Sequence, residues 1–260
     1  TTWNLPNYAS DLFTADAINT PILTAIGGLT GGVQTSDFEF ATSSQYSLPA
    51  AAQPAITETA SLTAPTATGF VRAQNTNVTQ IFQEKVSISY EKLSNGGRMS
   101  GLNTVGQTNN APSEKDFQIA RTLEKIARDI EYTIINGAYA KATTAAIANK
   151  TRGLVELCAT ANNVNNATAA ALTKPMINSL FKLMFDNGAI FSNMVLWTNS
   201  WQKQIITSLY SVAPTDRNVG GTNIQQIETD FGNIGISLNR FMPQTTVLAS
   251  EMSVLAPVFQ

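Results

Sequence analysis

The chain has 260 residues, 43% of them hydrophobic, so it is long enough to build a sizeable core in one large domain or two small ones. Charged residues make up only 13%, against about 25% in an average soluble protein, and the net charge of −2 argues against a dedicated nucleic-acid binder. Histidine is absent and Cys158 is the single cysteine, which excludes Ser-His-Asp and Cys-His catalysis, an internal disulfide and a cysteine-based zinc site.

The charges are unevenly distributed along the chain. The first 71 residues carry five acidic residues and no Lys or Arg, whereas the remainder holds all 16 basic residues and 13 acidic ones. This pattern arises either by chance at low charge density or because an acidic N-terminal third lies against a more basic surface, its own or a neighbour's. The sequence has no apolar run of about 18 residues, which predicts no transmembrane helix and no membrane partner.

The N-terminal segment, residues 1–36, is predicted to be an arm with one short helix. The segment starts TTWNLPNYAS, which is not a signal peptide and lacks an initiator Met, so we expect an N-terminus that is processed or incompletely represented. Pro21 is suited to the first turn of the helix, and Gly27 and Gly28 are suited to end it.

Two alternating segments flank a long excursion. Apolar residues fall on even positions in residues 37–48 (Phe38, Phe40, Tyr46 and Leu48) and again in residues 82–90 (Phe82, Val86, Ile88 and Tyr90). Period-two alternation predicts a strand with one apolar face in each segment. The stretch between them is rich in Pro, Ala and Thr and is unlike the inside of a compact domain, so we expect an extended hairpin.

The strongest predicted helix covers residues 113–136. An apolar stripe is expected to face inward, formed by Phe117, Ala120, Leu123, Ala127, Ile130 and Ile134. Lys125 with Asp129, and Arg128 with Glu131, have the spacing of ion pairs on the opposite, polar side. Gly137 is suited to stop the helix.

The rest of the chain is predicted to be a compact α/β unit. TRGLVEL, residues 151–157, suggests a strand. A helix begins after Thr173 and ends at Gly188, and a buried strand at residues 194–197 leads into a helix capped by Asn199. Strands are expected at residues 224–230, 232–241 and 246–249.

Few residues suggest chemistry. Asp230-Phe231-Gly232 matches the magnesium-binding triplet of protein kinases, but the histidine-containing catalytic loop cannot exist here, so a turn between two strands is predicted. The carboxylate pairs Asp37/Glu39, Asp129/Glu131 and Glu228/Asp230 are interpreted as solvated faces. Trp197 and Trp201 are interpreted as core and rim residues. We therefore expect no catalytic, metal or cofactor site.

Five stretches carry a resemblance to a known family. They are NYASDLF with TPILTAIGG, TNVTQIFQEKVSIS, RDIEYTIINGA, the TRGL turn, and ETDFGNIGISLNRFMPQTTVLAS, and they follow one another along nearly the whole chain. In this order they resemble the major capsid protein of tailed phages, with the HK-ninety-seven-type (Johnson) fold, in a branch often filed as a phage-capsid-like family of unknown function. Phe40 stands where that family suggests Trp.

The resemblance implies an α+β fold with four parts. These are an N-terminal arm (1–36), an extended hairpin loop (37–93), a peripheral domain (94–150) with a spine helix (113–136), and an α/β axial domain (151–260). The chain stops at VLAPVFQ, where this fold continues into strands that return to the peripheral domain, so we expect a truncated chain or a minimal variant.

The implied function is structural, without enzymatic activity. Copies of the chain would assemble as hexamers and pentamers into an icosahedral shell around double-stranded DNA, contacted non-specifically, with scaffold, portal and decoration proteins as further partners. The protein would be assembled in the host cytoplasm and located in the virion. Two alternatives stay open at this point: a secreted adhesin or surface-layer β-protein, and a nanocompartment or gene-transfer-agent shell of the same fold.

Charged residues of the arm, the hairpin and the spine helix are the candidate contacts between subunits. The acidic N-terminal third would lie over basic positions of adjacent copies. The candidates are Asp11, Asp16, Asp37, Glu39, Glu58, Arg72, Lys85, Lys92, Arg121, Lys125 and Arg128.

Overall fold

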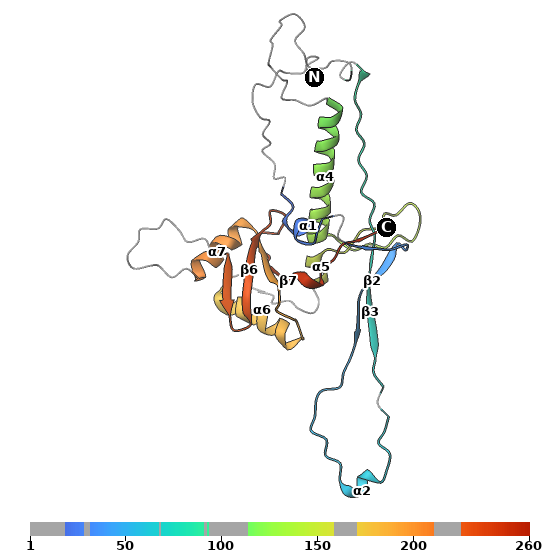
Figure 1. Cartoon of the computed structure of the whole chain (residues 1–260), viewed down its shortest axis with the longest axis vertical. Helices are drawn as coiled ribbons and strands as arrows, with labels where there is room; N and C mark the ends of the chain where they lie inside the picture. Colours follow the sequence, from blue (N-terminus) through green and yellow to red (C-terminus); the bar gives the residue numbers. More distant parts are fainter. Residues whose placement is uncertain are drawn as a thin grey trace, which may run out of the picture.

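A four-stranded sheet forms the centre of the body of the molecule (Figure 1). Its strands are β4 (Met194–Thr198), β5 (Gln226–Thr229), β6 (Gly232–Leu238) and β7 (Leu248–Glu251), in the order β5-β6-β4-β7. β4 runs parallel to β6 and antiparallel to β7, and β5 and β6 form an antiparallel pair. This computed structural model describes residues 19–28, 32–67, 69–90, 93, 114–158, 171–210 and 225–260.

Strand β4 is buried on both faces, which explains its nearly continuous apolar sequence MVLWT. On one face, Met194 and Leu196 pack with helices α6 (Lys174–Asp186) and α7 (Ser200–Tyr210). The members of this axial cluster are Ile177, Phe181, Met194, Leu196, Ile206, Ile227 and Ile234. On the other face, Trp197 packs in a second cluster with Ile22, Ile135, Met242 and Leu248. The sheet therefore lies between two layers of helix, an α+β arrangement.

Helices α6 and α7, which cover one face of the sheet, begin and end as their sequences predict. Thr173 is the N-cap of α6, and Gly188 follows its end with a φ of +83°, a conformation that favours glycine. The Asn199 side chain caps α7, since its Oδ1 accepts a hydrogen bond from Gln202 N at 2.9 Å. Strands β4, β5 and β6 and the two helices confirm the predicted elements, and β7 lies two residues later than predicted.

The Asp230-Phe231-Gly232 triplet forms the turn between β5 and β6, as predicted. Gly232 adopts a φ of +123°, and Thr229 Oγ1 accepts from Phe231 N and donates to Gly232 O. The Phe231 ring stacks on Phe191 at a centroid distance of 5.7 Å and lies 5.6 Å from Phe185. The phenylalanine therefore anchors the turn on the rim of the axial cluster.

The long helix α4 (Glu114–Asn136) confirms the predicted spine helix, but TRGLVEL is not a strand. Residues 154–158 form the short helix α5 (Leu154–Cys158), which follows Gly153. A Cβ added at Gly153 would lie 2.4 Å from Gly137 N, so the backbones at the end of α4 and the start of α5 touch directly. A short apolar run does not distinguish strand from helix, and here the close backbone contact selects the helix.

The predicted hairpin exists, but its second strand lies earlier than expected. β2 (Glu39–Tyr46) pairs antiparallel with β3 (Arg72–Val78), whereas the described residues 79–90 belong to no strand. A bulge at Thr42 shifts the register, so that Phe40 pairs with Asn77 but Tyr46 pairs with Arg72. Because a one-residue bulge inverts the alternation, Phe40 and Tyr46 lie on opposite faces and the predicted single apolar face is wrong.

Two expectations about α4 are also corrected. Leu123 was expected to face inward, yet it is 61% exposed, since the N-terminal half of the helix extends beyond the body (Figure 1). Asp129 and Glu131 were interpreted as a solvated pair. Asp129 is exposed, but Glu131 has no exposed surface, because it is covered by the N-terminal helix described below.

Short elements complete the chain. The arm contains helix α1 (Pro21–Ala25), as predicted, and strand β1 (Val33–Gln34). The hairpin carries helix α2 (Glu58–Ser61) at its tip. The C-terminal part adds the 3-10 helix η1 (Met252–Val254) and strand β8 (Val258–Phe259), and β8 pairs in parallel with β1. No helix among the described residues combines the length and the apolarity that crossing a membrane requires.

Candidate assembly surface

The hairpin exposes large apolar side chains that its own chain does not cover. It projects away from the sheet and helices, and its tip lies apart from the other described elements (Figure 1). The exposed apolar residues along it are Phe38, Tyr46, Leu48, Ile56, Leu62, Phe70 and Val71. Apolar surface of this extent on one element is typical of a protein–protein interaction site.

The tip of the hairpin is ordered by local hydrogen bonds. Thr57 Oγ1 accepts from Ala60 N at 3.2 Å and caps α2, and Ser61 Oγ donates to Glu58 O. Residues 47–71 contain no Lys or Arg, and Glu58 is their single charged side chain. The tip thus presents an apolar and weakly acidic surface.

The base of the hairpin is bonded firmly to the body. Asn77 Oδ1 accepts from Arg152 N at 2.8 Å, and Asn77 Nδ2 donates to Arg152 O at 3.3 Å. Thr151 Oγ1 donates to Val78 O, and Thr151 N donates to the Gln80 side chain. The TRG turn, residues 151–153, therefore fixes the direction in which the hairpin projects.

Arg152 is itself held in place on the body. Its guanidinium lies 4.3 Å from the centre of the Tyr139 ring, and its Nε lies 3.7 Å from Glu156 Oε1. Glu156 also accepts a hydrogen bond from Tyr139 N at 2.7 Å. These contacts connect the hairpin base, through one turn, to the chain that follows α4.

The spine helix exposes apolar and charged side chains on more than one side. Ile119 and Leu123 are exposed on one side, and Tyr132, nine residues after Leu123, is exposed on the opposite side. Arg121 pairs with Glu124 at 2.8 Å, and Lys125 pairs with Asp129 and with Glu84, which lies in the segment after β3. Solvent-accessible pairs of this kind stabilise the fold little, by about 0.2–1 kcal/mol each, but they order the charged side chains on the surface of α4.

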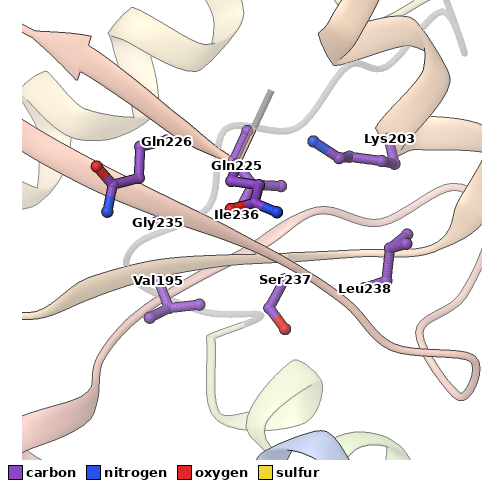
Figure 2. A pocket seen from close by; sticks show the side chains of 8 residues that line it. All are labelled: Val195, Lys203, Gln225, Gln226, Gly235, Ile236, Ser237 and Leu238. Carbon is purple, nitrogen blue, oxygen red and sulfur yellow. The ribbon is translucent and has the colours of Figure 1, made fainter. Parts of the chain in front are cut away.

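The hollow on the sheet offers little chemistry (Figure 2). It has a volume of about 410 Å³ and is lined by Val195, Lys203, Gln225, Gln226, Gly235, Ile236, Ser237 and Leu238. Lys203 is the single titratable side chain in this lining, and burial lowers its pKa.

Other candidate reactive residues have structural roles. Burial raises the pKa of the Cys158 thiol, so the thiol keeps its proton at neutral pH and is a poor nucleophile. Trp197 is buried and donates from Nε1 to Ser250 Oγ at 2.8 Å, whereas Trp201 is exposed on α7. Among the described residues, no three His, Cys, Asp or Glu side chains are grouped as a metal site would require.

Comparison with protein families gives one decisive match. The family described as SU10 major capsid protein matches residues 1–260. The chain belongs to this family. It is a structural capsid protein, as a tailed-phage major capsid protein is expected to be, and its place is in the virion. A search of the curated proteins found no match.

Membership in the SU10 major capsid protein family confirms the capsid prediction made from the five sequence stretches. It gives no support to an adhesin, a surface-layer protein or a nanocompartment. A capsid protein self-associates into a shell. The exposed apolar side chains of the hairpin and of α4 therefore belong to a protein that works in many copies.

Three of the candidate contact residues, Glu39, Lys125 and Arg121, form ion pairs within the subunit. Glu39 accepts from Lys141 Nζ at 2.5 Å, and Lys125 pairs with Glu84. Sequence reasoning missed Lys141 and Glu84 as partners, because neither has helical or strand spacing to the residue it contacts. Arg121 pairs with Glu124 on its own helix.

The other candidates have different positions. Asp37, Glu58, Arg72 and Lys85 are exposed and, within the described part of the chain, form no ion pair. Arg128 is half-buried on α4. Asp11, Asp16 and Lys92 lie outside the residues that the structure describes.

Pairing of Glu39 with Lys141 shifts the pKa of both side chains. The hydrogen bond from Lys141, helped by one from Thr76, holds the pKa of the Glu39 carboxyl below its usual value, and Glu39 raises the pKa of Lys141. Both side chains are exposed, so water and salt weaken the attraction. The pair orients the hairpin base rather than supplying much stability.

Proposed function

We propose that the chain builds an icosahedral shell around double-stranded DNA, and that its hairpin lies on adjacent copies. The observation that carries this proposal is the contrast within the hairpin itself: its base is bonded to the TRG turn, while its tip exposes Leu62 and Phe70 to solvent. An element fixed in direction and uncovered at its end is suited to reach a neighbour. Obligate interfaces bury about 2,000–5,000 Å² and are apolar, as this surface is.

We further propose that the fold is of the HK-ninety-seven type. The arm (1–36), hairpin loop (37–93), peripheral domain (94–150) and axial domain (151–260) would be its parts, with α4 as the spine helix. The element order of the described residues supports this division. Hexamers and pentamers, assembly in the host cytoplasm, and scaffold, portal and decoration partners belong to the same proposal.

The charged candidates contribute at the edges of the subunit interfaces. Asp11, Asp16, Asp37 and Glu58 would face basic positions of a neighbour, such as Arg72, Lys85, Lys92 and Arg128. The net charge of −2 suits a shell wall that encloses DNA without neutralising many of its phosphates. The structural role of the family and the absence of histidine support a shell protein without catalytic activity.

The test removes the apolar tip without disturbing the subunit. The double variant Leu62→Ser/Phe70→Ser should leave the free energy of unfolding within about 0.5 kcal/mol, since both side chains are already solvated. Shell yield, measured by electron microscopy and size-exclusion chromatography, should fall at least about tenfold, because every subunit of the shell would carry the same weakened interface.

Val254→Ser is the matched control. Val254 is 72% exposed but lies in η1, away from the hairpin, so its variant should form shells at the wild-type yield. Normal shells from the Leu62→Ser/Phe70→Ser variant would contradict the role of the hairpin. A wild-type chain that never forms closed shells would contradict the proposed function as a whole.

A further inference from the structure

Glu131 is a buried carboxylate on the spine helix that binds the backbone of the arm. Its side chain has no exposed surface. Oε1 accepts from Ile22 N at 2.9 Å, and Oε2 accepts from Leu23 N at 2.7 Å. These two amides belong to the first turn of α1, where the N–H groups of a helix have no partner in the helix itself.

Helix α1 depends on this contact. It has five residues, and isolated helices shorter than about 12–15 residues are marginal in water. Its own N-cap residue, Thr20, makes no side-chain capping bond. The carboxylate of Glu131, 108 positions beyond Leu23, takes the place of a local cap, while Ile22 and Leu23 are buried on the second cluster.

A third donor connects the axial sheet to the same carboxylate. Asn239, at the end of β6, donates from Nδ2 to Glu131 Oε1 at 2.5 Å. Asn239 is buried, and it is held by its N–H bond to Thr198 O and by a bond that its Oδ1 accepts from Phe241 N. One carboxylate therefore joins the arm, the spine helix and the axial sheet.

We propose that Glu131 is a positioning residue that docks helix α1 on the spine helix and thereby fixes the point at which the preceding part of the arm joins the body. A carboxylate only accepts hydrogen bonds, so undocking of α1 strips it of two of its three donors while Asn239 stays in place. Undocking also removes the helix that covers the carboxylate, so the two hydrogen bonds and the burial of Ile22 and Leu23 are lost together.

The consequence for assembly rests on the proposed function. Asp11 and Asp16, candidate contacts with neighbouring copies, precede α1 in the chain, so the docked helix fixes the point from which their segment starts. Subunits that lack the Glu131 contact would then fold but hold α1 in no single position.

Hydrogen exchange of the unassembled full-length chain tests the docking. Glu131→Gln puts an amide NH₂ where the carboxylate accepts bonds, so the Ile22 and Leu23 amides should exchange about 10- to 100-fold faster. Amides of α6, such as those of Ile177 and Phe181 in the other cluster, should keep their wild-type rates. A merely structural role would raise the exchange rates of both regions together.

Two control variants keep the inference falsifiable. Glu124→Gln changes a partly exposed carboxylate on the same helix, paired with Arg121, and should leave the exchange of residues 22 and 23 unchanged. Asn239→Ala, for use if Glu131→Gln does not fold, keeps both backbone bonds and should accelerate α1 exchange by less. Unchanged exchange of α1 in Glu131→Gln, or equal acceleration in α6, would overturn the proposal.

Shell formation gives an independent readout. Glu131→Gln should form closed shells at lower yield than the wild type and the Glu124→Gln variant, as seen by electron microscopy. Equal yield together with faster α1 exchange would overturn the link between docking and assembly. If the wild type forms no shells, the proposed function fails, whereas the exchange comparison still decides the docking.

Discussion

Large apolar side chains are buried at the four-stranded sheet but exposed on the hairpin. In the sheet, β4 is covered on both faces, and Phe181 of α6 is fully buried against it. In the hairpin, Phe70 is 59% exposed although it belongs to the same chain and the same residue type. The sheet thus buries its apolar side chains within the subunit, while the hairpin leaves its own uncovered in the described part of the chain.

The largest expected difference in stability comes from a Phe→Ala substitution made once against the sheet and once in the hairpin. Phe181→Ala should lower the free energy of unfolding by about 3–5 kcal/mol, because it removes a fully buried ring and leaves a cavity. Phe70→Ala should change it by no more than about 0.5 kcal/mol. Urea denaturation of the unassembled chain measures both, and similar destabilisation of the two variants would refute the comparison.

Gly→Ala substitutions at one packed position and one open position compare the backbone packing of the body with that of the hairpin. A Cβ at Gly153 would lie 2.4 Å from Gly137 N and 2.7 Å from Ile135 O, so Gly153→Ala must move main chain. We expect a decrease of about 2–3 kcal/mol in unfolding free energy. Gly69 of the hairpin has nothing within 4 Å of such a Cβ, so Gly69→Ala serves as control and should be neutral in thermal denaturation.

Two carboxylates extend the comparison to pH. Glu251 accepts hydrogen bonds from Ser192, Asn193 and Ser253 at the end of β7. Burial raises the pKa of its carboxyl, but the hydrogen bonds from Asn193, Ser253 and Ser192 outweigh burial, so the pKa lies below its ordinary value. A depressed pKa means that the ionised form is favoured by folding.

The expected result follows from that sign. The contribution of Glu251 is fully present above about pH 4.5, its ordinary pKa, and is lost as the pH falls through the depressed value. Glu251→Gln should cost about 1–3 kcal/mol at pH 7, with the difference from wild type shrinking in acid. Glu39→Gln, at the exposed hairpin base, should not change the denaturation midpoint measurably at either pH.

Local signals in the sequence were sufficient for much of this fold. The helical periodicity of residues 117–134 and Gly137 predicted the spine helix, and the alternation of β5 and β6 and the glycine at position 232 predicted the turn. The family was also predictable, because five stretches in order identify it even though each is weak. What these elements share is that their determinants lie within a few residues of one another.

The errors have one physical cause, which is contact between distant segments. Glu131 was interpreted as solvated because nothing near it in sequence shows that α1 covers it. Leu123 was placed inside because helical periodicity shows which residues share a face but not whether that face has a partner. The second hairpin strand was placed at residues 82–90 because alternation reports an extended chain, not its pairing partner.

The short β1–β8 ladder forms beside the base of the hairpin, so its sequence positions determine when this part of the base can fold during synthesis. It pairs Val33 with Val258, and Gly32 packs so closely on Pro257 that a Cβ there would lie 2.1 Å from Pro257 O. At the usual rate of translation, residue 258 emerges roughly 10–45 s after residue 33. During most of that interval the hairpin and the TRG turn that directs it are already made, whereas the contacts of residues 258–260 with β1, Ser36 and Thr79 are not. The hairpin can therefore take its direction before these last contacts of its base form.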